Sequence, residues 1–191
     1  MPLAINDLPL AGLVKNATQS VHEEVEGLLL PALASIRTTE DYASILKMFY
    51  GYFYPLEKQI ENHIQAGNLP DIKERRKAAS ILHDLRQIGQ PTENLFLCDT
   101  LPAINNAPQA FGALYVLEGS TLGGKQIAKM LTKNPAIPEG ATRFFSGYGD
   151  QTGSRWKAFL EVFNQQPQKE EVTAAATETF YFLKGWMQHA I

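Results

Sequence analysis

Four histidines are the residues of this chain best suited to bind a transition metal or to exchange protons near neutral pH. Three of them, His63, His83 and His189, lie near the ends of expected helices or among charged residues. Surface or capping roles are therefore expected for these three. His22 differs, because it lies in the middle of a long expected helix.

The neighbours of His22 determine what its imidazole can do. Glu26 follows four residues later and Thr18 precedes by four, so all three lie on one helical face. A carboxylate at this spacing can hold one ring nitrogen while the other binds a ligand. The same pattern also occurs on an ordinary solvated helix face. No Glu stands three residues before any histidine, which excludes the paired Glu-x-x-His ligands of a ferritin-like di-iron site.

A second unusual feature is the segment GSTLGGK at residues 119–125. Its letters nearly match a phosphate-binding loop, but Gln126 stands where that motif needs Ser or Thr to hold magnesium. The chain also lacks the several apolar strands that a parallel sheet requires. A nucleotide-binding loop is therefore not expected.

The segment fits better as the middle of one helix from Pro108 to about Lys133. Each interior glycine costs about 1 kcal/mol relative to alanine, so some other requirement must favour the three glycines. Gly119 and Gly123 share a face, and their bare backbone lets a flat ligand or another helix approach closely. Both uses remain open at this point.

The elements that position these residues are all expected to be helices, because apolar residues recur at helical spacing through most of the chain. We expect the helices at residues 11–30, 40–65, 72–87, 108–133, 154–164 and 170–189. The second begins after a cap-like Thr38, three residues before Asp41, and the first is expected to end near Pro31. Residues 89–107 and 135–153 carry Gly, Pro, Asn and Thr and are expected to be loops. The fold class is therefore all-α, a multi-helix bundle.

Length and composition indicate one domain over residues 1–191, with residues 1–10 a loose N-terminal segment. The formal charge of −3 gives no reason to expect nucleic acid or anionic lipid as a partner. The sole cysteine, Cys98, cannot form an internal disulfide. With no secretory signal and no span of about 18 apolar residues, no membrane is expected and the location is expected to be cytoplasmic.

Two motifs together resemble the haem oxygenase family. The segment KNATQSVHEEVE at residues 15–26 is similar to that family's proximal helix, in which a histidine ligates the haem iron and a later glutamate stands behind it. The segment LEGSTLGGKQ at residues 117–126 is similar to the distal helix, whose glycines lie over the haem. The Glu-Gly-Ser-Thr-Leu-Gly-Gly form looks like the bacterial branch often paired with biliverdin-binding phytochromes. The resemblance covers about residues 10–190.

The resemblance implies that haem is both cofactor and substrate and is opened by O2 to biliverdin, carbon monoxide and ferrous iron. It assigns the iron to His22 and the orientation of that ring to Glu26, with Thr18 nearby. Gly119, Gly123 and Gly124 would lie over the porphyrin, and Lys15 and Arg155 would pair with its propionates.

One departure concerns Ser120, because many family members have an Asp there that orders the water chain delivering protons. A serine hydroxyl holds water but carries no charge, so the proton route and the ring-opening position stay open. Electrons would come from a ferredoxin or a flavin-linked reductase, and a biliverdin-binding phytochrome would accept the product.

Two other classes also remain open at this stage. A haem-binding carrier or sensor would keep His22 and leave the haem intact. A thiamin- or quinone-cofactor enzyme with the same helical fold would not need His22.

Overall fold

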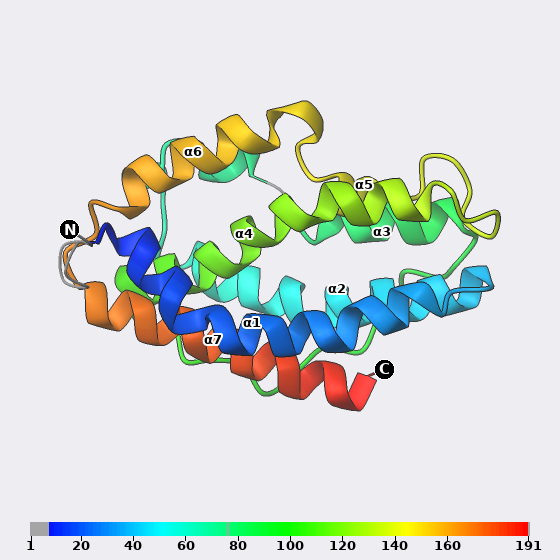
Figure 1. Ribbon diagram of the computed structural model, residues 1–191, viewed down its shortest axis with the longest axis horizontal. Helices are drawn as coiled ribbons and strands as arrows, with labels where there is room; N and C mark the ends of the chain where they lie inside the picture. The colour runs from blue at the N-terminus through cyan, green and yellow to red at the C-terminus, as the bar shows by residue number, and fades with distance from the viewer. Residues whose placement is uncertain (1–7, 76, 191) are drawn as a thin grey trace, which may run out of the picture.

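The computed structural model describes residues 8–75 and 77–190, and this part of the chain contains helices and no strands (Figure 1). The α-helices are α1 (Leu10–Ala34), α2 (Thr39–Glu61), α3 (Ala79–Gln87), α4 (Ala107–Leu131), α5 (Arg143–Ser146), α6 (Thr152–Phe163) and α7 (Lys169–Ala190). Two short 3-10 helices are η2 (Ile72–Glu74) and η3 (Gly149–Gln151). The all-α fold class predicted from the sequence is confirmed.

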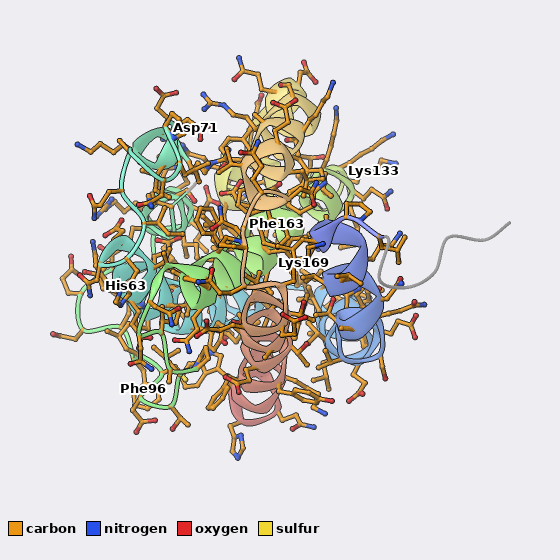
Figure 2. All side chains as sticks on the ribbon, turned by 90° about the vertical axis from the view of Figure 1, so that its left-hand side faces the viewer. His63, Asp71, Phe96, Lys133, Phe163 and Lys169 are labelled. Atoms are coloured by element: carbon orange, nitrogen blue, oxygen red, sulfur yellow. The ribbon has the colours of Figure 1, made fainter. Side chains whose placement is uncertain are left out.

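Helix α7 is the element against which both α1 and α4 pack most extensively (Figures 1 and 2). Its contact with α4 is close at Gly112, where a Cβ would meet the carbonyl oxygen of Val172 and lie 2.9 Å from the Cβ of Ala175. A larger side chain at position 112 would therefore force the two helices apart. Helix α1 ends at Ala34 and α4 begins 73 residues later, at Ala107, yet both pack against α7.

Helices α1 and α4 converge at their C-terminal ends. The Asn134 side chain donates to the carbonyl oxygen of Ile36 over 3.1 Å, and Leu33, Ala34 and Met130 line a cavity of about 480 Å³ beside this contact. Figure 1 shows both helices running in the same direction toward this end.

Helix α6 connects the opposite ends of the same two helices. The backbone N–H of Ala11, in the first turn of α1, donates to the side chain of Asn164 over 2.9 Å. Tyr115 of α4 stacks on Phe163 with ring centroids 4.9 Å apart and lies 5.3 Å from the Trp156 ring. The middle parts of α1 and α4 thus lie between two fixed ends.

Two helix starts follow directly from the sequence. The Thr38 hydroxyl accepts from the N–H of Asp41, and the Asp41 carboxylate accepts from the N–H of Thr38 over 2.9 Å, which completes a capping box before α2. The Asn106 side chain accepts from the N–H of Gln109, and Pro108 occupies the first turn of α4, where its missing N–H costs nothing.

The predicted end of the first helix near Pro31 was wrong, because α1 continues to Ala34. Pro31 cannot donate to the carbonyl of Gly27, but both residues are exposed, so the loss of this hydrogen bond falls on the solvent side of the helix. Beyond the proline, Ala32 and Leu33 are buried, and their packing keeps the chain helical. The second helix ends at Glu61, four residues before its predicted end.

The predicted helix over residues 72–87 was also wrong in its middle. The chain forms only η2 there, turns extended at Arg75, and begins α3 at Ala79. The break exists because the Arg75 side chain is drawn into the interior and the Glu57 carboxylate accepts from the N–H of Ala78 over 2.8 Å.

The predicted loop over residues 135–153 contains α5 and η3, which the sequence reading missed. Residues 1–7 of the expected loose N-terminal segment lie outside the described residues, and Leu10 is already a fully buried helical residue. Among the described helices, none has the length and apolar character needed to cross a membrane.

Candidate functional site

His22 lies on the exposed side of α1, with half of its side chain accessible to solvent. The edge of its ring contacts Phe180 of α7, with ring centroids 5.4 Å apart and an interplanar angle of 84°. Phe180 is itself buried, so the core of the protein limits how the imidazole can turn. The result is a histidine whose ring is supported on one side and open on another.

The other predicted residues of α1 lie on the same face as His22, as their spacing required. The Nε2 atom of His22 lies 3.8 Å from a carboxylate oxygen of Glu26, which is longer than a hydrogen bond. Lys15 is exposed two turns before His22. Thr18 is buried and its hydroxyl donates to the Val14 carbonyl over 2.8 Å, so that hydroxyl is already used by the helix.

The glycines of α4 have different surroundings. A Cβ at Gly123 would meet nothing within 4 Å, so the backbone there faces open space. A Cβ at Gly119 would lie 3.7 Å from the Trp156 ring, an ordinary contact. Gly124 faces the interior, where a Cβ would collide with the carbonyl oxygen of Phe145. Gly119 and Gly123 therefore leave the backbone exposed on one face of α4. At Gly124, the packing against Phe145 leaves no room for a side chain.

His22 and the glycine segment lie at the same level of the bundle. His22 is the thirteenth residue of the 25-residue α1, and Gly119 is the thirteenth residue of the 25-residue α4. The two helices run in the same direction and are joined just after their C-terminal ends by the contact between Asn134 and Ile36. With a rise of about 1.5 Å per residue, His22 and Gly119 each lie about 15–20 Å before the end of their helix.

Ser120 follows the first of these glycines on the outer side of α4. Its hydroxyl donates to the Leu117 carbonyl over 2.7 Å.

Arg155 is engaged away from the His22 face. Its guanidinium forms ion pairs with Asp71 over 3.1 Å and with Glu74 over 3.0 Å. It also lies over the ring of Tyr148. Arg155 is therefore grouped with η2 rather than with His22 and the exposed glycine face, and a propionate there would have to compete with two carboxylates.

Sequence reasoning missed a buried charged network behind the glycine segment. Arg75 and Glu118 are each almost completely buried, and their side chains meet over 2.7 Å. Arg75 also binds Asp71 through two parallel hydrogen bonds of 3.0 Å, a bidentate arrangement. The Tyr148 hydroxyl donates to the Glu118 carboxylate over 2.9 Å. The network joins η2, α4 and the segment before η3.

One sequence signal pointed toward this network. Glu118 is a charged residue at the end of an otherwise apolar run, residues 110–117, and such a residue within a buried stretch needs a partner. That partner is Arg75, which is buried, whereas Lys77 nearby in the sequence pairs at the surface with Glu61 over 3.1 Å. Arg76 lies outside the described residues.

A second buried carboxylate fixes the support beneath Gly124. Asp84 is fully buried and accepts from the N–H groups of Arg143 and Phe144 over 2.9 and 2.8 Å, which holds the start of α5. Burial raises the pKa of Asp84, and these hydrogen bonds act in the opposite direction. Asp84 thereby places Phe145, whose carbonyl oxygen lies against Gly124.

Two of the other histidines make local contacts. His83 lies 3.3 Å from Asp84, and the exposed His189 contacts the Gly185 carbonyl over 2.7 Å. The described residues contain no group of three or more His, Cys, Asp or Glu side chains placed to hold a metal ion.

Comparison with solved structures places the fold in a defined class. The chain resembles the haem oxygenase of Neisseria meningitidis, with a TM-score of 0.80, 24% identity, and coverage of 96% of this chain and 92% of that one. It also resembles the haem oxygenase of Leptospira interrogans, with a TM-score of 0.76, 18% identity, and coverage of 95% and 100%. A third is haem oxygenase-1 of Synechocystis sp. PCC6803, solved in complex with haem, with a TM-score of 0.74, 15% identity, and coverage of 95% and 92%. The fold is that of haem oxygenases.

Sequence comparison leads to the same class. A curated relative, the haem oxygenase of Xanthomonas campestris pv. campestris (strain 8004), is 28% identical over 137 residues, which is 72% of this chain and 80% of the relative. The family described as Heme oxygenase matches residues 8–189. The chain belongs to the haem oxygenase family, as the two sequence motifs indicated.

Proposed function

We propose that this chain is a haem oxygenase that binds haem between α1 and α4 as one domain and converts it to biliverdin, carbon monoxide and ferrous iron. The observation that carries the proposal is the placement of a half-exposed histidine and a side-chain-free stretch of backbone at the same level of two parallel helices. Family membership over residues 8–189 supports the same activity.

The residues present suit a flat iron-bearing ring. An imidazole nitrogen of His22 would hold the iron, and Phe180 limits the rotation of that ring. On the opposite side, Gly123 has the open space that a planar ligand requires, and a Cβ at this position would fill it. Haem supplies the redox chemistry and is itself the molecule consumed.

Each remaining residue of the proposed site has one task. Glu26 holds the second nitrogen of His22 after a small side-chain movement that shortens the present 3.8 Å. Lys15, exposed on the same face, neutralises a propionate. Ser120 holds a water molecule near the reacting face. We place Gly124 outside direct contact with the ring, because it faces Phe145.

The partners in this proposal are O2 and an external electron donor such as a ferredoxin or a flavin-linked reductase, because residues 119–126 form part of a helix and not a nucleotide-binding loop. A biliverdin-binding phytochrome is the proposed acceptor of the product. The free thiol of Cys98 accords with a reducing compartment, and we propose a cytoplasmic location.

The deciding experiment loads the purified protein with one equivalent of haem and adds ascorbate, or ferredoxin with its reductase, in air. The proposal predicts loss of the Soret band, growth of a biliverdin band, and release of one carbon monoxide per haem, trapped by deoxymyoglobin. Haem that binds and stays intact would instead identify a carrier or sensor. Failure of haem to bind at all would favour an enzyme that uses the fold for another cofactor.

A further inference from the structure

The glycine segment of α4, residues 119–124, has a low intrinsic stability as a helix. Three glycines within six residues lower its intrinsic helical stability by about 3 kcal/mol relative to alanines. On the outer side, a Cβ at Gly123 would meet nothing within 4 Å, so this position has open space beside it. On the inner side, Glu118, Thr121 and Gly124 are buried and connect the segment to the rest of the protein.

The inner contacts are largely charged. Glu118 immediately precedes Gly119, and its carboxylate accepts from Arg75 over 2.7 Å and from Tyr148 over 2.9 Å. Arg75 is held in turn by two bonds to Asp71, and its guanidinium lies 5.3 Å from the centroid of the Phe159 ring. Every one of these bonds has a direction, so the network fixes both the distance and the rotation of α4 at this point.

A buried ion pair is a poor way to gain stability alone. The free energy lost when two charges leave water can be as large as the free energy gained from their attraction. Apolar residues of similar volume often stabilise a protein better. In some proteins such a pair instead fixes a unique geometry. Glu118 lies one residue before the glycine backbone of the proposed haem site. The geometry of the ion pair therefore affects the position of the backbone that faces the ligand.

We propose that Glu118, Arg75 and Tyr148 are positioning residues that fix the glycine segment of α4 over the bound ring and thereby set which meso carbon is attacked. This inference rests on the proposed haem oxygenase function. A backbone shift of about 1 Å at Gly119 or Gly123 changes the free space above the ring edge, and reactions in such sites respond strongly to misplacement of this size.

The first test uses the haem-free protein and measures hydrogen–deuterium exchange of the amides at residues 117–124. Glu118→Gln keeps the shape of the side chain and its bond from Tyr148 but removes the charge that pairs with Arg75. We expect exchange in this segment to become at least about tenfold faster. Lys58→Gln, which breaks the exposed pair between Lys58 and Glu61 over 2.9 Å, is the matched control and should leave this segment unchanged.

The second test loads the same proteins with haem and measures the ratio of biliverdin isomers. Glu118→Gln and the milder Tyr148→Phe should shift the ratio, and Lys58→Gln should not. If Glu118→Gln fails to fold, Tyr148→Phe carries the test, because it removes one hydrogen bond and no charge.

A double variant separates positioning from stability. Arg75→Met with Glu118→Leu replaces the pair by apolar side chains, while Asp71 keeps its second partner, Arg155. We expect the unfolding transition to return toward that of the wild type while the isomer ratio stays altered. An isomer ratio that equals the wild type in Glu118→Gln, or that recovers together with stability in the double variant, would overturn the proposal.

The two proposals fail in different ways. If the wild-type protein does not degrade haem, the proposed function is wrong, and the exchange measurement still decides whether the charged network fixes the glycine segment. If the wild type produces biliverdin and the variants give the same exchange and the same isomers, the function stands and the positioning role is wrong.

Discussion

Gly123 and Gly124 are adjacent residues with opposite surroundings. Gly123 faces open space on the side assigned to the ligand, whereas Gly124 is pressed against the Phe145 carbonyl. The family resemblance implied that both lie over the haem, because a sequence motif shows which positions lack a side chain and not what fills the space beside them. Only the fold shows that Asp84 and α5 occupy the space beside Gly124.

This contrast gives a paired prediction. Gly123→Ala should raise the free energy of unfolding of the haem-free protein by about 0.5–1 kcal/mol, because alanine favours the helix and meets no atom. The same change should weaken haem binding, because the new methyl group occupies the ring's space. Gly124→Ala should lower the free energy of unfolding by about 1–3 kcal/mol through collision with the Phe145 carbonyl. Urea unfolding and a haem titration measure both effects.

The opposite pattern for either residue contradicts the assignment of the two glycine faces. In particular, a Gly123→Ala protein that is more stable and binds haem as tightly as the wild type would place the ligand elsewhere.

Helices were the scale at which sequence reasoning was most reliable. The capping box at Thr38, the start of α4 at Pro108 and the helical period of α2 were all visible in the sequence and are confirmed. The errors occurred where a long-range contact overrides local preference. Packing carries α1 through Pro31, and the partners of Arg75 and Glu57 break the expected helix over residues 72–87.

The capping box at the start of α2 predicts a pH dependence. Hydrogen bonds from the N–H groups of Arg37 and Thr38 lower the pKa of Asp41 below its value in the unfolded chain. Its contribution to stability is therefore complete above about pH 4 and is lost as the pH falls through the lowered pKa. Asp41→Asn should destabilise the protein modestly at pH 7, and this difference should shrink as the pH falls below about 4.

Urea unfolding at pH 7, 5 and 3 checks this, with Glu40→Gln as the control in the same helical turn. Glu40 makes no bond to the backbone N–H groups of the cap. A difference between wild type and Asp41→Asn that persists unchanged at pH 3 would show that the charge of Asp41 is not what stabilises the start of α2.

At the scale of the whole molecule, the arrangement of the site depends on contacts that are remote in the sequence. Helix α7 supports both α1 and α4, and its Phe180 contacts the His22 ring. Helical period in the sequence predicts which face of each helix is buried, but not which helix covers it. The motifs identified the family and most of the residues on the α1 face, while the pairing of Arg155 with η2 and the Arg75–Glu118 network required the fold.

The account as a whole depends on iron ligation by His22. The most direct test compares the absorption spectrum of the haem-loaded wild type with that of His22→Ala, with His189→Ala as the control. We predict a sharp Soret band for the wild type and the control, its loss with about 100-fold weaker binding for His22→Ala, and its return when imidazole is added. A His22→Ala protein that binds haem with the wild-type spectrum and affinity would contradict the account.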